Sequence, residues 1–231
     1  MKVLASAPVP DFDVYVARAD TQYVQRESEA VEELYELGYL PYSGTKDTRG
    51  IFHSARSSRV VLADFSPTSE NRRIAKKFDG QFTKRRIDAR EFEADEAFYT
   101  FWMSYFAQRH GANVMPRERL ELWLSSGLVT TIIEYRDTER AVGYVLEIES
   151  GPMCHYWFSA YDLALTKQSL GLWLMLDCLR DAKDAGLAHY YLGTVYGQKA
   201  LYKTNFEPLE WHDGATWSRD LELLKEKSRQ E

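Results

Sequence analysis

The chain of 231 residues has few cysteines and no cysteine motif. Its two cysteines, Cys154 and Cys178, cannot form a framework of disulfides, and they do not make a Cys-x-x-Cys pair. Each lies in an apolar run, so we expect both thiols to be buried in the core. These absences argue against a disulfide-rich secreted domain and against a cysteine metal site.

Long apolar segments are also missing. No run approaches the ~18 residues that a membrane-spanning helix needs. The start, MKVLASAPVPDFDVYV, lacks the basic-then-apolar order of a signal peptide. Because 45% of the residues are hydrophobic and 14% are aromatic, the chain can still build a globular core. We therefore expect a cytoplasmic protein without a membrane partner.

Positive charge is scarce overall but concentrated in one segment. The net charge is −6, whereas residues 71–90 hold eight Lys or Arg against two Asp and contribute +6, which leaves −12 for the remainder. A basic segment on an acidic body can attract a polyanion at one place and repel it elsewhere. We call residues 71–90 the basic segment.

Residues 1–90 are expected to form a smaller N-terminal lobe. Apolar residues at helical spacing predict a helix within residues 21–39 that stops at Gly38, a natural C-terminal cap. Residues 50–55 and 58–65 are typical of strands. Thr68 or Ser69 can cap a helix that continues through the start of the basic segment, with Glu70 favourable in its first turn.

Residues 91–231 are expected to form the second domain. Helices within 91–111 and 115–127 precede three strands, near 128–136, 140–149 and 152–162, which the short turns between them make an antiparallel meander. A long helix over about 167–185, a strand at 187–193, a short helix at 198–205 and strands around 208–211 and 215–218 follow. The order β-β-β-α-β-α-β is typical of an α/β (α+β) acyltransferase fold of the GNAT-like type. In that fold the donor and the acceptor meet where two neighbouring strands splay.

The start of the long helix tests one possible donor, coenzyme A. CoA-dependent acetyltransferases usually open this helix with Gln/Arg-x-x-Gly-x-Gly/Ala, because small residues let a pyrophosphate reach the backbone N–H groups of the helix N-terminus. The string QSLGLW supplies Gln168 and Gly171, but Trp173 stands where the last small residue belongs. An indole there is expected to obstruct CoA, and CoA-dependent acetylation stays open as the alternative.

A second set of motifs covers more of the chain. It comprises the run 58–73, SRVVLADFSPTSENRR, and four later strings: Tyr161-Asp162, Ser169-Leu170-Gly171, Tyr191-Leu192-Gly193 and the run 202–210, YKTNFEPLE. Over residues 50–211, about two-thirds of the chain, these motifs resemble the aminoacyl-tRNA–protein transferases, the arginyl and leucyl transferases of the N-degron pathway.

The resemblance implies both the reaction and the partners. An amino acid, Leu or Arg, would leave its ester with tRNA and join the N-terminal amine of a protein that begins with Asp or Glu, which marks that protein for degradation. Such an ester is already activated, so positioning and one proton acceptor supply much of what the reaction needs. Aminoacyl-tRNA and proteins with an acidic N-terminal residue are the expected partners, and no cofactor is expected.

One catalytic residue is expected in the site. Asp162, at the end of a predicted strand, is the candidate that binds the attacking ammonium or accepts its proton, and a helix-capping role is equally open. Arg72 and Arg73 are candidates for the carboxylate of the acceptor, because a guanidinium pairs with it bidentately; the alternative is a solvated basic face. The other expected substrate-binding residues are Lys76, Tyr161, Ser169, Gly171, Tyr191, Gly193, Tyr202 and Lys203.

We also assign expected roles to one histidine, one lysine and three tyrosines in or near these motifs. His155 lies inside a strand and is expected to be a packed histidine rather than a base. Tyr202 and Lys203 are adjacent, so both cannot be buried; Lys203 is expected on a tRNA phosphate or on the carboxylate of the acceptor. Tyr191, Tyr196 and Tyr202 are expected to stack on the terminal adenine or to line an aminoacyl pocket.

One departure from the family affects its cofactor. The family commonly carries N-terminal cysteines that can hold an iron–sulfur cluster, whereas the corresponding stretch here has Ser54, Ser57 and Ser58. No metal cluster is therefore expected. A third possibility also stays open, a non-catalytic module that binds tRNA or protein N-termini without turnover.

Overall fold

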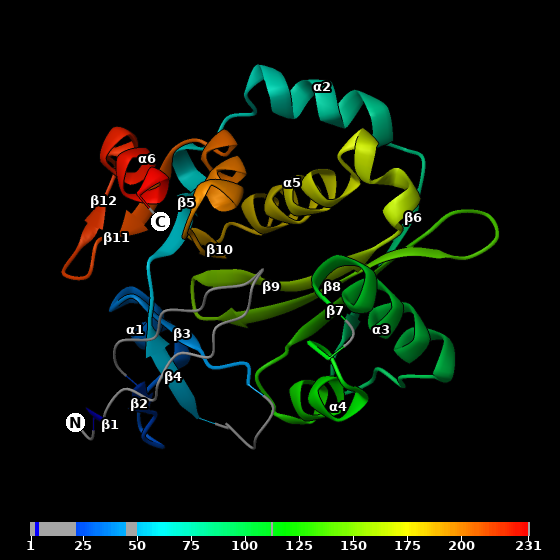
Figure 1. The fold of residues 1–231 in the computed structure, drawn as a ribbon, viewed down its shortest axis with the longest axis horizontal. Helices are drawn as coiled ribbons and strands as arrows, with labels where there is room; N and C mark the ends of the chain where they lie inside the picture. The colour runs from blue at the N-terminus through cyan, green and yellow to red at the C-terminus, as the bar shows by residue number, and fades with distance from the viewer. Residues whose placement is uncertain (1–2, 5–21, 45–49, 112, 231) are drawn as a thin grey trace.

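Two β-sheets organise the fold (Figure 1). The larger sheet has eight strands in the order β12-β11-β5-β10-β9-β8-β7-β6, and the smaller has four in the order β1-β2-β4-β3. The computed structural model describes residues 3–4, 22–44, 50–111 and 113–230. Within these residues, no helix is both long enough and apolar enough to cross a membrane.

The smaller sheet is built from the N-terminal part of the chain. Its strands are antiparallel: β1 (Val3–Leu4), β2 (Gln22–Val24), β3 (Tyr39–Pro41) and β4 (Ile51–Ser54). Helix α1 (Val31–Glu36) ends as predicted before Gly38, whose φ of +81° suits glycine. The predicted helix is wrong at its start, because Gln22–Val24 pair with β4 and bury Tyr23 in the sheet instead.

One face of the larger sheet is covered by two helices, α2 (Ser69–Phe78) and α5 (Leu170–Asp184). Thr68 caps α2, as expected, and forms a capping box with Asn71. Helix α5 connects β9 (Met153–Tyr161) to its parallel neighbour β10 (His189–Thr194). Cys154 and Cys178 lie in the core between α5 and the sheet, which confirms their predicted burial.

The opposite face is covered by α3 (Glu96–His110) and α4 (Arg117–Ser125). Aromatic residues of α3, among them Trp102 and Phe106, form a core with strands β8 and β9. The predicted meander is present: β7 (Thr131–Arg136), β8 (Ala141–Ser150) and β9 pair as antiparallel neighbours. The aromatic residues of α3 therefore belong to the core.

The larger sheet also contains strands from the predicted N-terminal lobe. Strand β5 (Ser57–Val61) lies between β10 and β11 (Leu209–His212), and β6 (Thr83–Asp88) forms an edge beside β7. A short 3₁₀ helix, η1 (Leu62–Asp64), follows β5. The division at residue 90 stays a prediction, but the two parts share this sheet.

The remaining elements lie in the C-terminal part of the chain. Residues 163–168 form the 3₁₀ helix η2 (Leu163–Gln168), so α5 begins later than predicted. The short helix η3 (Gln198–Asn205) and the strands β11 and β12 (Trp217–Ser218) lie where the sequence placed them. Helix α6 (Leu221–Arg229), which was not predicted, packs beside η3.

Strands β9 and β10 separate partway along their length. They pair through only three residue pairs, the last of which is Tyr191 with His155. Beyond this point β10 bulges between Tyr191 and Gly193 as it follows β5, while β9 continues beside β8 to Tyr161. The separation predicted for this fold therefore begins at His155 and Tyr191.

Candidate functional site

Three residues meet where β9 and β10 separate. Gly193 adopts a φ of +80°, and a Cβ built on it would lie 3.4 Å from Nε2 of His155 and 3.8 Å from Nζ of Lys203. The missing side chain of Gly193 thus leaves a space that an imidazole and an amine both face. We call His155, Gly193 and Lys203 the splay site.

Lys203 is a buried lysine. Its side chain is only 8% exposed, and Nζ donates a hydrogen bond to the carbonyl oxygen of Thr194 at 2.5 Å. Within the described residues, no carboxylate forms an ion pair with it. Because burial disfavours the ammonium form, the pKa of Lys203 falls to about 7. Lys203 can therefore hold or release a proton near neutral pH.

His155 lies on the other side of the space beside Gly193. It is 2% exposed, as expected of a packed histidine, and its Nδ1 is 2.8 Å from the hydroxyl of Tyr35 on α1. Burial, together with the charge of Lys203, lowers the pKa of His155 to about 3, so the imidazole is neutral. Its Nε2 has no hydrogen-bond partner in the part of the chain that the structure describes.

Strand β5 fixes the backbone on the other side of Gly193. The hydroxyl of Ser58 donates to the carbonyl oxygen of Gly193 at 3.0 Å, and β5 pairs with β10 on both sides of the bulge. Ser57 and Ser58 are fully buried. The two serines therefore adjoin the splay site. No group of three or more His, Cys, Asp or Glu in the described residues could hold a metal ion.

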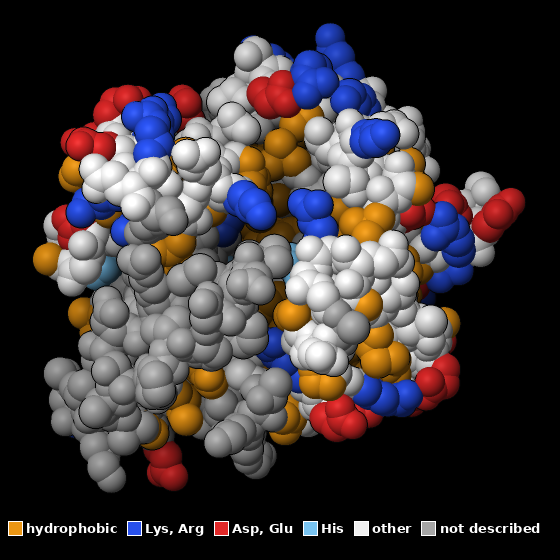
Figure 2. Space-filling model, viewed as in Figure 1, with side chains coloured by type: hydrophobic (Ala, Val, Ile, Leu, Met, Phe, Trp, Pro, Cys, Tyr) orange, Lys and Arg blue, Asp and Glu red, His pale blue; other side chains and the backbone are white. Residues whose placement is uncertain are grey.

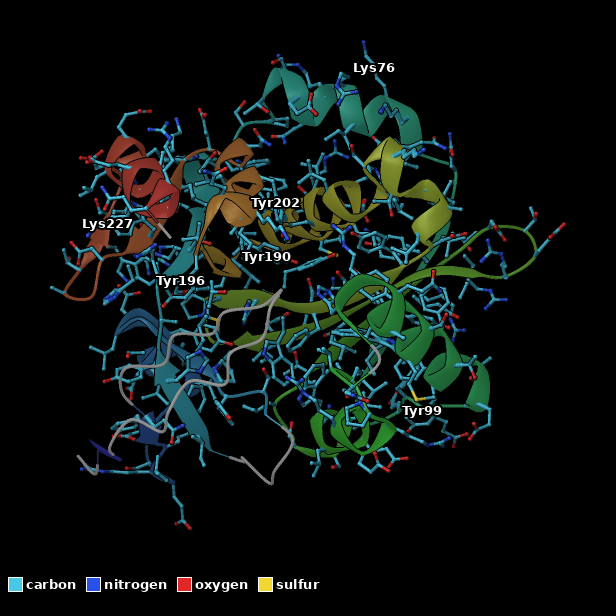
Figure 3. All side chains as sticks on the ribbon, in the orientation of Figure 1. Lys76, Tyr99, Tyr190, Tyr196, Tyr202 and Lys227 are labelled. Carbon is cyan, nitrogen blue, oxygen red and sulfur yellow. The ribbon has the colours of Figure 1, made fainter. Side chains whose placement is uncertain are left out.

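Three of the predicted residues gather at this place. Gly193 and Lys203 form the site, and Tyr191, which is 1% exposed, packs its ring against Tyr35 at 4.9 Å between centroids. Tyr202, the neighbour of Lys203, is 44% exposed, so one of the two is buried and the other is not, as predicted. Figure 3 shows Tyr196 and Tyr202 close to β10 and η3. Phe206 is fully buried in the core.

The exposed surface near these tyrosines is hollowed. Figure 2 shows Lys and Arg side chains at the rim of a hollow near the middle of this face, with hydrophobic side chains inside it. The hydroxyl of Tyr196 accepts a hydrogen bond from the backbone N–H of Arg56 at 2.8 Å, and the guanidinium of Arg56 lies over the ring at 4.9 Å. Basic and aromatic groups thus stand together on this face.

Three other predicted substrate-binding residues, Tyr161, Ser169 and Gly171, lie around the start of α5. A Cβ on Gly171 would be 2.6 Å from the ring of Tyr161, so the tyrosine ring packs directly on the glycine. Ser169 adopts a φ of +73° at the junction between η2 and α5. The indole of Trp173 is turned into the core, where Nε1 donates to Asp79 at 2.8 Å. Gly171 therefore accommodates a protein side chain, Tyr161.

Asp162 has the local role that the sequence left open as its alternative. Its carboxylate accepts a hydrogen bond from the backbone N–H of Ala164 at 2.9 Å, which caps η2. It also forms an ion pair with Arg140. Both contacts are structural, so the catalytic role of Asp162 stays a prediction.

The predicted basic residues of α2 are exposed. Arg73 pairs with Glu70 one turn earlier at 2.5 Å, and Arg72 donates to the carbonyl oxygen of Pro67. Lys76 points away from the molecule (Figure 3). A pair between exposed residues on one helix contributes little to stability, so these side chains can exchange their partners for others.

The remainder of the basic segment makes internal ion pairs, which the sequence did not reveal. On β6, Lys84 contacts Asp177 and Asp181 of α5 at 2.7 Å, and Arg86 contacts Glu147 of β8 at 3.1 Å. Arg90 pairs with Asp88. Much of the charge that the sequence offered to a polyanion therefore binds β6 to the rest of the protein.

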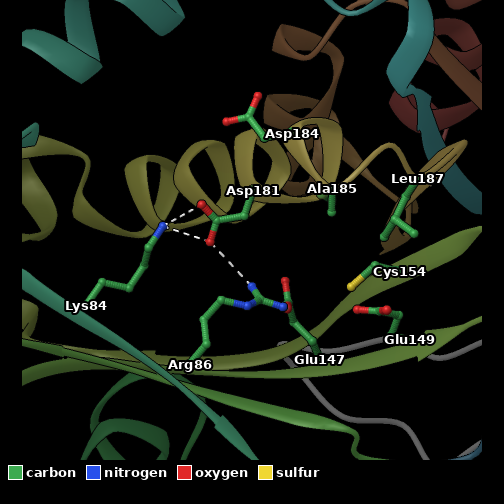
Figure 4. Close-up of a pocket in the computed structure, with 10 residues that line it drawn as sticks. Lys84, Arg86, Glu147, Glu149, Cys154, Asp181, Asp184, Ala185 and Leu187 are labelled. Carbon is green, nitrogen blue, oxygen red and sulfur yellow. Dashed lines mark hydrogen bonds and ion pairs between the residues drawn. The ribbon is translucent and has the colours of Figure 1, made fainter.

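These ion pairs border a cavity of about 450 Å³ (Figure 4). Its lining includes Glu147, Cys154 and Asp181. Since successive residues of a strand point to opposite faces, Cys154 faces α5 while His155 faces α1. The cavity and the splay site therefore lie on opposite faces of the larger sheet.

Comparison with known proteins places the chain in a family. A family model described as an acetyltransferase (GNAT) domain matches residues 69–204. An aspartate/glutamate leucyltransferase of Ruegeria sp. is 30% identical over 174 residues, which cover 70% of this chain and 61% of that protein. The protein of the same name from Hyphomonas neptunium is 30% identical over 177 residues, which cover 71% of this chain and 68% of that protein. The chain thus spans about three-fifths to two-thirds of the length of these curated relatives.

Solved structures with similar architecture share little sequence. FemX aligns with a TM-score of 0.47 and 11% identity over 86% of this chain and 64% of that chain. L-PGS from Bacillus licheniformis aligns with a TM-score of 0.47 and 13% identity over 74% of this chain and 51% of that chain. From the family model and the curated relatives, the chain belongs to the aspartate/glutamate leucyltransferase family of aminoacyl-tRNA–protein transferases and carries its GNAT-like domain.

Proposed function

We propose that this protein transfers an aminoacyl group, leucyl in the first place, from charged tRNA to the N-terminal amine of a protein. The observation that carries the proposal is the buried amine of Lys203, which faces the space beside Gly193 where β9 and β10 separate. The names of the relatives supply the class of donor and acceptor. In this proposal the reaction takes place in the cytoplasm and marks the acceptor for degradation.

The bond changes require one proton acceptor and one proton donor. The neutral α-amine attacks the ester carbonyl carbon, and a C–N bond forms as the carbonyl electron pair moves to oxygen. Neutral Lys203 takes the proton that the nitrogen loses. The carbonyl then re-forms, the ester C–O bond breaks, and the lysine ammonium returns the proton to the ribose oxygen. Because its pKa is about 7, Lys203 suits both transfers.

The acidic residue of the acceptor needs a cation that can be reached from solvent. Arg72 and Arg73 remain the candidates, because their present partners are a backbone carbonyl and an exposed glutamate. If they bind the acceptor carboxylate, replacing both with Ala raises KM for peptides that begin with Asp and leaves peptides that begin with Ala unaffected. If the double variant and the wild-type protein have the same KM for the peptide that begins with Asp, these arginines are not part of the site.

A transfer assay tests the proposal directly. The full chain is incubated with leucyl-tRNA or arginyl-tRNA and with peptides that begin with Asp, Glu or Ala, and the extended peptides are identified by mass spectrometry. We expect leucine on the peptides that begin with Asp or Glu. Transfer of arginine instead of leucine would change the proposed donor to arginyl-tRNA and would leave the proposed type of reaction unchanged. Tight tRNA binding without transfer from either donor would favour the non-catalytic alternative.

CoA-dependent acetylation is the second candidate, favoured by the description of the matching family model. Against it stands the start of α5, where the ring of Tyr161 occupies the space above Gly171 that a pyrophosphate would need. Titration calorimetry with acetyl-CoA separates the two functions. We expect no heat of binding at concentrations where charged tRNA binds, and a stoichiometric heat would support acetylation instead.

A further inference from the structure

The imidazole of His155 is held by a tyrosine from a distant part of the chain. Tyr35 belongs to α1, and its hydroxyl lies 2.8 Å from Nδ1 of His155 across 120 residues of sequence. The ring of Tyr35 also meets His155 edge-on at 5.4 Å and Tyr191 at 4.9 Å between centroids. Because Tyr35 is 0% exposed and His155 is 2% exposed, these contacts fix the orientation of the imidazole.

The hydrogen atoms of this pair can be assigned from their surroundings. Burial raises the pKa of the Tyr35 hydroxyl well above its ordinary value and lowers that of His155, so the phenol is protonated and the imidazole is neutral. A neutral imidazole carries one hydrogen, on Nδ1 or on Nε2. In the described part of the chain, His155 is the partner of the Tyr35 hydroxyl.

Only one of the two tautomers gives the tyrosine O–H an acceptor. In the described residues each tautomer leaves one donor without an acceptor: with the hydrogen on Nδ1 it is the enclosed O–H of Tyr35, and with the hydrogen on Nε2 it is the Nε2–H, which faces the space beside Gly193 where a substrate oxygen can accept it. If Nδ1 is bare, it accepts the O–H of Tyr35. The hydrogen then lies on Nε2, the atom that faces the space beside Gly193.

We propose that Tyr35 holds His155 in the tautomer that presents Nε2–H to the carbonyl oxygen of the aminoacyl ester, so that His155 is a catalytic residue and Tyr35 positions it. This inference rests on the proposed function for the identity of the ester. Its geometric basis is the Nε2 atom, which has no partner in the described residues and lies 3.4 Å from the position of a Cβ on Gly193.

The proposed contact stabilises charge without transferring a proton. When the amine attacks, the carbonyl electron pair moves to oxygen, and the Nε2–H donates a hydrogen bond to that developing oxyanion. A neutral imidazole suits this task, because it keeps its hydrogen throughout. Lys203 handles the proton of the attacking amine, so the two side chains divide the work between oxygen and nitrogen.

The tautomer can be measured without any substrate. Long-range ¹H–¹⁵N correlation spectra of the protein labelled in its histidines distinguish a protonated from a bare ring nitrogen. The chain has five histidines, so the signals that disappear in His155→Gln identify those of His155. We expect hydrogen on Nε2 and a bare Nδ1. Hydrogen on Nδ1 in the wild-type protein would overturn the inference.

A matched pair of tyrosine variants tests the positioning role. Tyr35→Phe removes the hydroxyl that contacts Nδ1. Tyr190→Phe removes an equally buried hydroxyl, which donates to Glu147 at 2.6 Å on the opposite face of the sheet. We expect Tyr35→Phe to give mixed His155 tautomers and a kcat lower by roughly tenfold at unchanged KM, a smaller loss than removal of an oxyanion donor. Tyr190→Phe should change the His155 tautomers and kcat less than Tyr35→Phe does.

Two variants of His155 test the donor itself. His155→Gln keeps an N–H at the end of a side chain of similar reach, whereas His155→Met keeps the bulk and removes the donor. We expect His155→Met to lower kcat by roughly 100-fold or more and His155→Gln to retain part of that difference. Equal kcat values for Met and Gln would overturn the inference, provided that circular dichroism shows both variants folded.

The outcomes separate this inference from the proposed function. If no aminoacyl group is transferred from any tRNA while the spectra show Nε2–H, the function is wrong and the fixed tautomer stands. If transfer occurs and Tyr35→Phe or His155→Met leaves kcat unchanged, the function stands and His155 has no part in it.

Discussion

Two clusters of ionisable residues lie on opposite faces of the larger sheet, and they differ in how their charges are partnered. Around β6, Lys84 and Arg86 each contact carboxylates of α5 or β8 at 2.7–3.4 Å. At the splay site, Lys203 is more deeply buried, and among the residues that the structure describes its hydrogen-bond partner is a backbone carbonyl. In the first cluster, carboxylates neutralise the charges of Lys84 and Arg86. At the splay site, Lys203 can gain or lose its charge.

This difference in partners distinguishes a cluster that contributes to stability from one that can take part in catalysis. A buried charge that is fully paired keeps its protonation state over the ordinary range of pH, and its removal acts on stability. A buried amine without a counter-ion has its pKa moved toward neutrality, which is typical of catalytic groups. The most basic stretch of the sequence is thus largely structural, whereas the chemistry is proposed at a single lysine, Lys203, of the short helix η3.

The largest effect is expected when Lys203 is replaced. Lys203→Met keeps the length and the apolar stem but removes the amine, so transfer should fall by about 100-fold or more, as for the loss of a general base. The matched control is Lys199→Met, an exposed lysine of the same short helix. The kcat of both variants is measured with one charged tRNA and one peptide. Loss of activity in both, or in neither, would remove the contrast between the clusters.

The pH dependence of stability gives a second test of Lys203. Burial lowers its pKa in the folded protein from 10.5 to about 7, so between these two values the unfolded chain binds a proton that the folded protein does not. Stability therefore rises with pH across this window because of Lys203. Chemical denaturation at pH 7 and at pH 10 should show a larger gain for the wild-type protein than for Lys203→Met. An identical gain in both proteins would mean that the amine is not held neutral.

The paired cluster should respond in stability instead. Arg86→Met leaves the buried carboxylate of Glu147 without its cation, which we expect to cost about 2–3 kcal/mol, less than a fully enclosed pair because Arg86 is 37% exposed. Arg85→Met is the control, since Arg85 is 67% exposed and Glu134 keeps Arg136 as a partner at 3.0 Å. Urea denaturation measures both. At temperatures where Arg86→Met stays folded, its kcat should match that of the wild-type protein.

Local patterns in the sequence were enough to predict much of the fold. The meander of β7, β8 and β9, the helix α5 and the end of α1 at Gly38 follow from alternation, helical spacing and a glycine cap. Strand β6 was missed, because a run such as TKRRID has no apolar alternation. Its basic side chains are held by carboxylates about 90 residues later on α5, which no local pattern reveals.

The site was predictable only in part, for the same reason. Family motifs pointed to Gly193 and Lys203. They predicted that Lys203 contacts a ligand, but they did not predict that its amine is buried. His155 was expected to be a packed histidine, and it is buried. Its contact with Tyr35 joins the larger sheet to α1 and depends on the tertiary fold. Motifs can therefore name residues of a site, whereas the protonation state of each residue depends on its distant neighbours.

The smallest effect in this series is expected from one added methyl group, and two glycines with the same φ allow it to be isolated. Gly193 and Gly80 both have a φ of +80°, so an alanine at either position should cost a similar ~1 kcal/mol of stability through backbone strain. Their surroundings differ: nothing lies within 4 Å of a Cβ on Gly80, in the basic segment, whereas a Cβ on Gly193 enters the space that His155 and Lys203 face. Gly193→Ala should therefore lower transfer by roughly tenfold, since small misplacements at a reacting centre are costly, and Gly80→Ala should leave it unchanged. If both variants lose stability equally and neither loses activity, the space beside Gly193 is not where the ester and the amine meet.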